Sequence, residues 1–200
     1  MINNNTSSDD YFNELQENTN VFWKKLVPVH LPYTINLKKQ LRGKTLEVGC
    51  GLGRNLKHLQ DGSLGVDHNK KSVMFCLSKG FPALHTDDFL KTSLYEKNHF
   101  DNLLVSHVLE HIELDKQADL LREYIPYLKK ESRIFIITPQ ERGHQLTDSH
   151  ITWTDFDRIK EILIESASDF EIRTSYSFPL PRIFGKWFNY NEFNVVAERI

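Results

Sequence analysis

The residues best suited to chemistry are histidines and one glutamate in two separate segments of the chain. His107, Glu110 and His111 have the i, i+3 and i+4 spacing that brings side chains to one face of a helix, and they directly follow an apolar run. His150 belongs to a later segment at residues 148–154. Imidazole and carboxylate groups in this combination would hold a first-row divalent metal. The candidate metal ligands are therefore His107, Glu110, His111 and His150.

A metal at this place would have a clear chemical use. A free hydroxyl is a poor nucleophile at neutral pH, and a metal bound to its oxygen lowers the pKa of the hydroxyl while a histidine removes the proton. The candidate catalytic residues are His107, His111 and His150. Two other interpretations stay open, namely a metal-free pocket in which one histidine acts as the base, and purely structural roles for all of these side chains.

A glycine-rich stretch at residues 45–54, Thr-Leu-Glu-Val-Gly-Cys-Gly-Leu-Gly-Arg, is the second chemical feature. Its alternating glycines lack a Cβ atom, so the backbone can turn sharply and a ligand can approach closely. A strand, such a turn and a helix N-terminus together form a nucleotide-type site. Glu47 precedes the glycines, and a carboxylate there would repel a pyrophosphate but suit a cationic amino-acid ligand. Asp67, 20 residues after Glu47, is placed to bind ribose hydroxyls.

Alternating strands and helices are expected to position these residues. The expected strands lie at residues 45–48, 63–67, 83–85, 100–106 and 132–138. The expected helices lie at residues 55–60, 69–79, 112–128 and 155–166, with Gly80 ending the second and Pro126 kinking the third. Alternation of this kind predicts a parallel, doubly wound α/β sheet whose strand ends meet at one rim, where ligands bind. Two extended segments, 170–178 and 190–198, would add antiparallel strands at one edge.

The length predicts a single main domain, at residues 43–200. Residues 1–10 are predicted to be a flexible tail, and residues 11–42 a helical lead-in that packs on the sheet edge or acts as a lid. The net charge of −2 and a pI near 6.5 give no basic field for nucleic acid or an anionic membrane. No apolar run approaches the roughly 20 residues needed to cross a bilayer, the N-terminus has no apolar signal core, and the cysteines form no disulfide framework. We therefore expect a cytoplasmic protein.

Between residues 45 and 140 the chain resembles the class I S-adenosylmethionine-dependent methyltransferases. The matching pieces occur in the family's order and are residues 46–54, 65–67, 86–89, 100–111 and 136–139. The pattern Gly-x-Gly-x-Gly, with Arg54 directly after it, differs from the Gly-x-Gly-x-x-Gly of dinucleotide sites. The resemblance implies a single Rossmann-like domain with a mostly parallel seven-stranded sheet and an antiparallel C-terminal hairpin. It also implies that the cofactor is S-adenosyl-L-methionine.

The resemblance assigns cofactor contacts by position. The expected neighbours of the methionine part are Glu47, Gly49, Gly51, Gly53 and, at its carboxylate, Arg54. The expected neighbours of the nucleoside are Asp67 at the ribose hydroxyls, Asp87 or Asp88 at the adenine amino group, and Phe89 stacked on the ring. The set is completed by His68 and by Ser106 at the end of the fourth strand. The alternatives are solvated loop acids for Glu47 and Asp67, and core packing for Phe89.

Some methyltransferases carry a pattern related to the histidine segment. The small-RNA terminal 2′-O-methyltransferases have Glu-x-x-Glu-His after the fourth strand and a later Asp-His-x-Phe-Glu-Trp-Thr-like segment, and they use both in a metal site. The ubiquinone-pathway O-methyltransferases share the first motif. The chain is similar at Glu110, His111 and residues 150–154. It departs at His107, which replaces the first glutamate and would favour a nitrogen-preferring metal over Mg²⁺.

Residues 140–154 and 176–190 are expected to cover the methyl acceptor. The second segment is aromatic with Arg182 and Lys186 interleaved, which suits a nucleobase, a sugar, or a phosphorylated or carboxylated small molecule. A hairpin loop whose aromatics fill the sheet edge is the alternative. Because the overall charge is acidic, we expect O-methylation of a small-molecule or glycan-precursor acceptor rather than RNA. A metal-free N- or O-methyltransferase, a small-RNA 2′-O-methyltransferase and a non-catalytic cofactor-binding regulatory protein are the alternatives.

Overall fold

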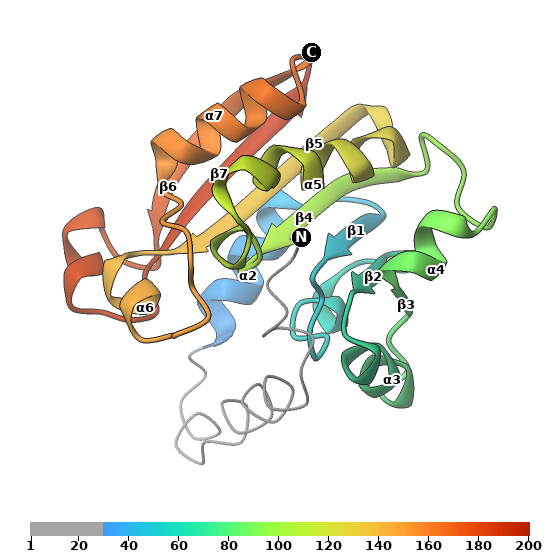
Figure 1. The fold of residues 1–200 in the computed structure, drawn as a ribbon, viewed down its shortest axis with the longest axis horizontal. Helices are drawn as coiled ribbons and strands as arrows, with labels where there is room; N and C mark the ends of the chain where they lie inside the picture. The colour runs from blue at the N-terminus through green and yellow to red at the C-terminus, as the bar shows by residue number, and fades with distance from the viewer. Residues whose placement is uncertain (1–29) are drawn as a thin grey trace.

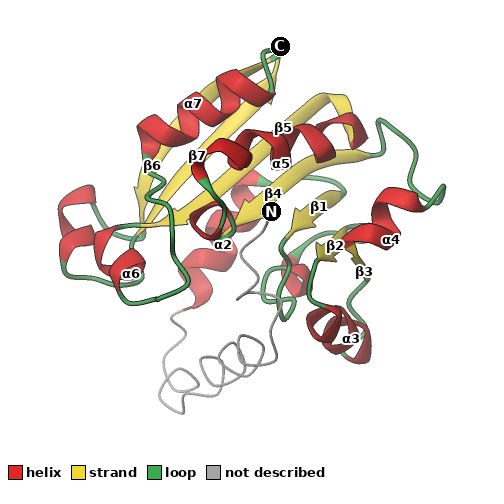
Figure 2. Ribbon diagram, in the orientation of Figure 1, coloured by secondary structure: helices red, strands yellow, loops and turns green. Residues whose placement is uncertain are grey.

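A seven-stranded sheet forms the centre of the fold in the computed structural model, which describes residues 30–200. The strand order is β3-β2-β1-β4-β5-β7-β6 (Figures 1 and 2). The strands are β1 Thr45–Val48, β2 Leu64–Asp67, β3 Ala83–His85, β4 Phe100–Ser106, β5 Leu128–Pro139, β6 Phe170–Phe178 and β7 Glu192–Arg199. β1 to β5 run parallel, whereas β7 is antiparallel to both β5 and β6. The predicted mostly parallel sheet with an antiparallel C-terminal hairpin is confirmed.

Helices cover both faces of this sheet. The α-helices are α2 His30–Gln40, α3 Lys70–Ser78, α4 Thr86–Lys91, α5 Gln117–Tyr124, α6 Glu141–Gln145 and α7 Phe156–Ser166. The 3-10 turns are η3 Leu56–His58, η4 Leu109–His111, η5 Leu114–Lys116, η6 Ile125–Tyr127 and η7 Arg182–Lys186. Alternate residues of β5 show the two layers, because Ile134 and Ile136 pack with α4, α5 and α7 while Phe135 and Ile137 pack with α2. Figure 1 shows α5 and α7 on the near face and α2 behind the strands.

The described part of the predicted lead-in is α2. Its Leu37 and the following Leu41 pack on Leu104 of β4 and Phe135 of β5, so the helix lies on a face of the sheet rather than at its edge. Asn36 Nδ2 also donates to Asn194 Oδ1 at 2.8 Å. The predicted tail at residues 1–10 and the remainder of the lead-in up to residue 29 lie outside the described residues. The role of the lead-in as a lid stays a prediction.

The helix expected at residues 55–60 is only the short turn η3. Asn55 precedes the turn but does not cap it, because its side-chain amide donates to Glu47 Oε1 instead. Leu56 is buried against α3, and the chain returns to an extended conformation at Leu59. The short connection between β1 and β2 therefore has no full helix, and it leaves its polar side chains near the strand ends.

The helix expected at residues 112–128 is also shorter, because α5 begins at Gln117 and ends at Tyr124. Gln117 is buried and donates from Nε2 to Leu109 O and to Thr154 Oγ1, which anchors the start of the helix. Pro126 lies in the 3-10 turn η6 that follows the helix. β5 then begins at Leu128, four residues before the expected start, with an irregularity in its pairing to β4 between Phe100 and Asn102.

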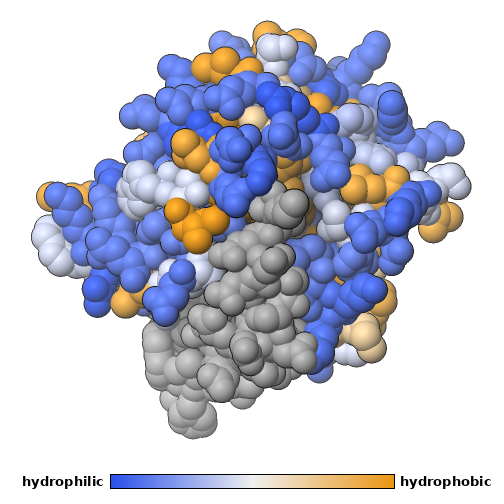
Figure 3. Space-filling view, in the orientation of Figure 1, coloured by the Kyte–Doolittle hydropathy of each residue, from blue (hydrophilic) through white to orange (hydrophobic). Residues whose placement is uncertain are grey.

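Residues that favour helix ends mark the boundaries of α3 and α7. Asn69 caps α3 by accepting from Lys71 N and Ser72 N, and Gly80 has the positive φ of 78° expected after a helix end. Asp155 caps α7 by accepting from Arg158 N. Between residues 30 and 200 there is no helix with the length and apolarity needed to span a bilayer. The near face of the molecule is mainly hydrophilic (Figure 3).

Candidate functional site

The glycine-rich turn after β1 has a backbone that other residues would not adopt easily. Gly49, Gly51 and Gly53 have positive φ values of 71°, 51° and 71°. A Cβ atom on Gly49 would lie 2.4 Å from Val108 Cγ2, and one on Gly53 would lie 2.7 Å from Phe81 Cδ2. Both the conformation and the space therefore require glycine at these positions. The turn keeps the end of β1 open to the close approach of a ligand.

Glu47 provides a buried acid beneath this turn. Its side chain is 2% exposed, and Oε1 accepts from Asn55 Nδ2 at 2.7 Å. Oε2 is buried and has no hydrogen-bond partner among the described residues. Burial raises the pKa of Glu47 from 4.5 to about 8, only partly offset by the Asn55 hydrogen bond and the Arg54 charge. A buried oxygen with no partner, beside a turn restricted to glycine, fits the cationic amino-acid end of S-adenosylmethionine.

Asp67 joins the end of β2 to the glycine turn. Its Oδ2 accepts from Gly51 N and its Oδ1 from Asn69 N, both at 2.8 Å. The side chain is buried, which argues against a solvated loop acid, and each oxygen keeps a further lone pair. His68 Nδ1 lies 3.7 Å from Asp67 Oδ1. Asp67 thus contacts the glycine turn and His68 lies beside Asp67, while the ribose contact of Asp67 and the cofactor contact of His68 stay predictions.

The segment after β3 differs from the expectation at one residue. Asp87 and Asp88 are exposed in the first turn of α4, where either carboxylate is accessible. Phe89 is 0% exposed, and its ring packs with Tyr95, Tyr124 and Tyr127 at centroid distances of 5.9, 5.8 and 4.7 Å. Because α4 turns Phe89 into the core, no face of its ring is open to an adenine base. This corrects the stacking role that the resemblance implied and agrees with the core-packing alternative.

His107 is held between two carboxylates. Its Nδ1 lies 3.2 Å from Glu110 Oε1, and its Nε2 lies 2.9 Å from Glu192 Oε1. Burial favours the neutral ring, but the two carboxylates outweigh it and raise the pKa of His107 to about 9. Both ring nitrogens of His107 thus face carboxylate oxygens, and the group of mutually close ligand atoms consists of Glu110, His111 and His150 without His107. In this arrangement neither nitrogen of His107 is open to a metal or to a proton. Its φ of 56° is uncommon for a residue with a Cβ atom.

The other predicted ligands do come together. Glu110, His111 and His150 each offer a ligand atom, and these atoms lie within 4.8 Å of one another. His111 Nδ1 lies 3.0 Å from Ser149 O, and His150 Nδ1 lies 3.1 Å from His144 O. Since a carbonyl oxygen only accepts, each Nδ1 carries the hydrogen and each Nε2 carries the lone pair. This arrangement is typical of metal-binding histidines, whose second nitrogen is oriented by a backbone carbonyl.

The charges of this cluster also suit a metal. Burial lowers the pKa of His111, and it lowers the pKa of His150 to about 4, so both rings are neutral as ligands must be. Burial alone would raise the pKa of Glu110, but the His107 hydrogen bond outweighs it and keeps the carboxyl ionised. Glu110 Oε2 is buried without a hydrogen-bond partner in the described part of the chain. The donor set of these three residues therefore fits a divalent ion.

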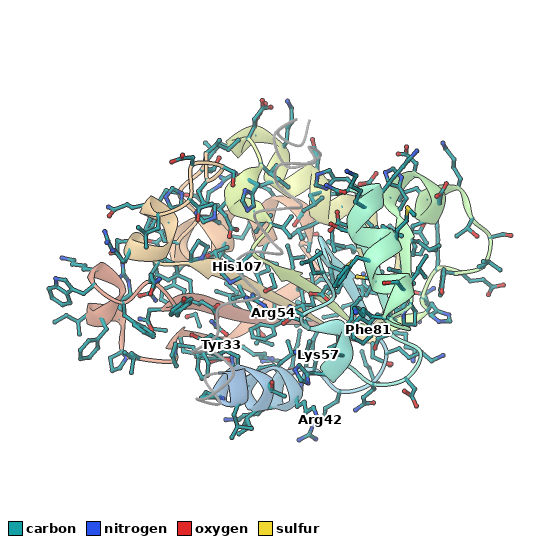
Figure 4. The ribbon with its side chains drawn as sticks, turned by 90° about the horizontal axis from the view of Figure 1, so that it is seen from below. Tyr33, Arg42, Arg54, Lys57, Phe81 and His107 are labelled. Atoms are coloured by element: carbon teal, nitrogen blue, oxygen red, sulfur yellow. The ribbon has the colours of Figure 1, made fainter. Side chains whose placement is uncertain are left out.

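A cavity of about 350 Å³ is lined by Glu192, the carboxylate that contacts His107 Nε2, whereas Glu110, His111 and His150 lie outside its lining. The cavity lies between α2, the residues after the glycine turn, the ends of β4 and β5, and the β6–β7 connection. Its lining includes Tyr33, Arg54, Lys57, Ser106, Phe188 and Glu192. Figure 4 shows Tyr33, Arg54, Lys57 and His107 in the structure. Arg182, which the sequence placed at the acceptor, instead forms a two-armed ion pair with Glu141 and lies over the Phe193 ring. Arg182 and Lys186 do not line this cavity.

A family model described as a methyltransferase domain matches residues 15–198. The chain belongs to this family. The chain is thus a class I S-adenosylmethionine-dependent methyltransferase, and S-adenosylmethionine is its methyl donor, in agreement with the fit of Glu47 and the glycine turn. Comparison with curated proteins gives no match.

Solved structures of methyltransferases share the fold. A S-adenosylmethionine-dependent methyltransferase from Archaeoglobus fulgidus is 22% identical with a TM-score of 0.66, covering 96% of this chain and 100% of its own. A possible histamine N-methyltransferase from Thermotoga maritima is 14% identical with a TM-score of 0.70, covering 94% and 97%. Magnesium protoporphyrin IX methyltransferase from Synechocystis, with bound SAH, is 13% identical with a TM-score of 0.67, covering 98% and 97%. At these identities the likeness shows the fold and not the acceptor.

Several site residues were not found from the sequence. Glu192 stands 85 residues from His107 and reaches it only because β7 inserts beside β5. Asn55 and Lys57 follow the glycine turn, and the expectation of a regular helix there gave no reason to single them out. For Glu192, the one available signal in the sequence was that an acidic residue stands near the start of the last extended segment. Tyr33 lies in the lead-in, for which a lid was one of two expectations, but no residue of the lead-in was singled out from the sequence.

Proposed function

We propose that the enzyme transfers the methyl group of S-adenosylmethionine to a hydroxyl group of a small molecule or glycan precursor, with a divalent metal held by Glu110, His111 and His150. One observation carries this proposal. The buried, partnerless Oε2 of Glu110 belongs to a cluster with two imidazoles whose Nδ1 hydrogens are tied to carbonyl oxygens. A cluster serving only to stabilise the fold would be expected to satisfy that oxygen within the protein.

The proposed chemistry divides between the cofactor, the metal and the chain. The cofactor supplies a methyl group on a positively charged sulfur. A divalent ion at the three-residue cluster would supply a Lewis acid that lowers the pKa of an acceptor hydroxyl. Glu47 and the glycine turn bind and orient the cationic end of the cofactor. The walls of the cavity exclude water and hold the acceptor in line with the methyl group. This alignment accounts for much of the rate acceleration.

His107 has a positioning role in this proposal. As a cation it donates to Glu110 Oε1 and to Glu192 Oε1, so its two ring nitrogens fix a candidate metal ligand and a cavity wall at the same time. It also leaves the second oxygen of Glu110 for another ligand. The donor set of two nitrogens and one carboxylate suits Zn²⁺, Mn²⁺ or Fe²⁺ better than Mg²⁺, which prefers oxygen.

The test is a methyl-transfer assay with cofactor labelled in the methyl group and a mixture of cellular metabolites as acceptors. We expect a labelled methyl ether, loss of transfer in a strong chelator, and recovery when Zn²⁺ or Mn²⁺ is added. His150→Asn should lose both activity and bound metal. His99→Asn is the matched control, because His99 packs on Phe100 at the opposite end of β4. Full activity of the metal-free protein would end the metal proposal, and label on nitrogen would end the hydroxyl proposal.

A second candidate, metal-free O- or N-methylation, is favoured by one observation. Glu192 lines the cavity and is held at 2.9 Å by His107, so its carboxylate is placed to take a proton from an acceptor. Activity that survives in chelator but disappears in Glu192→Gln would favour this candidate over the metal-assisted one.

A further inference from the structure

The cavity beside the strand ends has walls of different character. On one side Arg54 and Lys57 follow the glycine turn, and both side chains are exposed. On the other side Glu192 begins β7. The remaining lining is largely aromatic and apolar, with Tyr33, Phe188, Ile137 and Pro179 among its residues. Cations on one wall and an acid on another determine the orientation in which a ligand with one charged end binds in the cavity.

The cationic wall is available for a ligand. Arg54 and Lys57 form no hydrogen bond or ion pair through their side chains with other residues of the 30–200 segment. The positive charge of Arg54 already acts on Glu47, which places Arg54 on the border with the cofactor. Lys57 lies one further turn along the chain, in η3, so its ammonium is the cation left for a second ligand.

The aromatic wall is rigid. The Tyr33 hydroxyl donates to Tyr190 O at 2.6 Å, and its ring meets Phe178 edge-on at a centroid distance of 5.3 Å. Burial raises the pKa of Tyr33, with Glu192 adding to the effect, so the phenol stays neutral. A neutral ring fixed in this way offers an apolar surface rather than a charge. It suits the body of a ligand and not its anionic end.

Resting on the proposed function, we propose that the methyl acceptor is a hydroxylated small molecule with one anionic group, a carboxylate or a phosphate, on an apolar or ring-shaped body. The anion contacts Lys57 and Arg54, and the body lies against Tyr33. The hydroxyl points to the wall formed by Ser106 and Glu192, which is the side of the cavity connected through His107 to Glu110. The opposite orientation would place the anion against the Glu192 carboxylate, which repels it. A cavity of about 350 Å³ suits a metabolite and is too small for a folded polymer segment.

The test is calorimetric binding to protein saturated with S-adenosylhomocysteine, using 4-hydroxybenzoate, 4-hydroxyphenyl phosphate and neutral 4-hydroxybenzamide as probes. We expect at least one anionic probe to bind about ten-fold more tightly than the amide, and the identity of that probe separates carboxylate from phosphate. Lys57→Met should remove most of this preference and Lys57→Arg should keep it. Lys130→Met, a neutralised exposed lysine at the far end of β5, is the control and should bind as the wild type does.

Each contrary result has its own meaning. Equal binding of the three probes, no binding of any of them, or a preference that survives in Lys57→Met would overturn the proposal. Weaker binding of S-adenosylhomocysteine in Lys57→Met, with no effect on the probes, would assign Lys57 to the cofactor and also overturn it. A failure of the proposed function is distinguishable, because probe binding would then persist without label transfer to a hydroxyl or without bound metal.

Discussion

Replacing Glu47 by glutamine should change the pH dependence of stability. Burial raises the pKa of this carboxyl from 4.5 to about 8, so between these pH values the folded chain holds a proton that the unfolded chain has lost. Stability must therefore fall as pH rises across this window, by about 1.4 kcal/mol per pH unit. From pH 5.5 to 7.5 the contribution of Glu47 changes by about 2.5 kcal/mol, slightly less than two full units because the folded carboxyl begins to ionise near pH 7.5. Glu47→Gln stays neutral and removes this contribution.

The assay is urea unfolding of the cofactor-free wild type and of Glu47→Gln at pH 5.5, 6.5 and 7.5. Other titrating groups affect both proteins alike, so the difference between the two free energies of unfolding isolates Glu47. We expect the free energy of unfolding of Glu47→Gln to rise by about 2–3 kcal/mol relative to that of the wild type between pH 5.5 and pH 7.5. A difference that does not change with pH would refute the reasoning that Glu47 is buried in its neutral form.

The same variant tests the cofactor contact. A cationic ligand beside Oε2 favours the ionised carboxylate, so binding of S-adenosylmethionine to the wild type at pH 7 should release a proton. Calorimetry in buffers of different ionisation enthalpy measures that release. Glu47→Gln should release none and bind the cofactor about 10–100-fold more weakly. Unchanged affinity would place the cationic end of the cofactor elsewhere.

Three further substitutions have separable outcomes. Gly49→Ala combines a positive φ with a Cβ atom 2.4 Å from Val108 Cγ2. It should lower the free energy of unfolding in urea by about 2–4 kcal/mol and abolish cofactor binding measured by calorimetry. Normal binding would contradict the glycine requirement. Phe89→Leu should cost about 1–3 kcal/mol of stability yet leave cofactor affinity within about two-fold, whereas a large loss of affinity would restore its adenine role. Arg182→Met breaks a surface ion pair with Glu141, so stability should change by about 1 kcal/mol or less and probe binding should not change.

Local patterns in the sequence were sufficient for much of the fold and part of the site. The glycine spacing after β1 predicted a turn that the positive φ values of Gly49, Gly51 and Gly53 confirm. Glu110 and His111 were predicted to lie with His150 because their segments follow neighbouring parallel strands, and parallel strands end at one rim. Predictions of this kind depend on short-range spacing and on the handedness of the crossovers.

The remaining features depend on contacts distant in sequence. His107 has the right spacing for a metal ligand, but Glu192 on β7 takes its Nε2, and no local pattern shows which acid will meet it. Phe89 follows an acidic pair as an adenine contact would, yet three tyrosine rings enclose it in the core. Tertiary packing also shortened the helix after Asn55, whose side chain bonds Glu47 instead of capping the turn.

Anomalous scattering from crystals soaked with Zn²⁺ or Mn²⁺ tests the proposed metal site most directly. We expect one peak at roughly 2.0–2.2 Å from the Nε2 atoms of His111 and His150 and from a carboxylate oxygen of Glu110, with His107 outside the coordination shell. The same peak should be missing in His150→Asn. A peak coordinated by His107, or no peak at these three residues while the protein still methylates a hydroxyl, would contradict the proposed metal site.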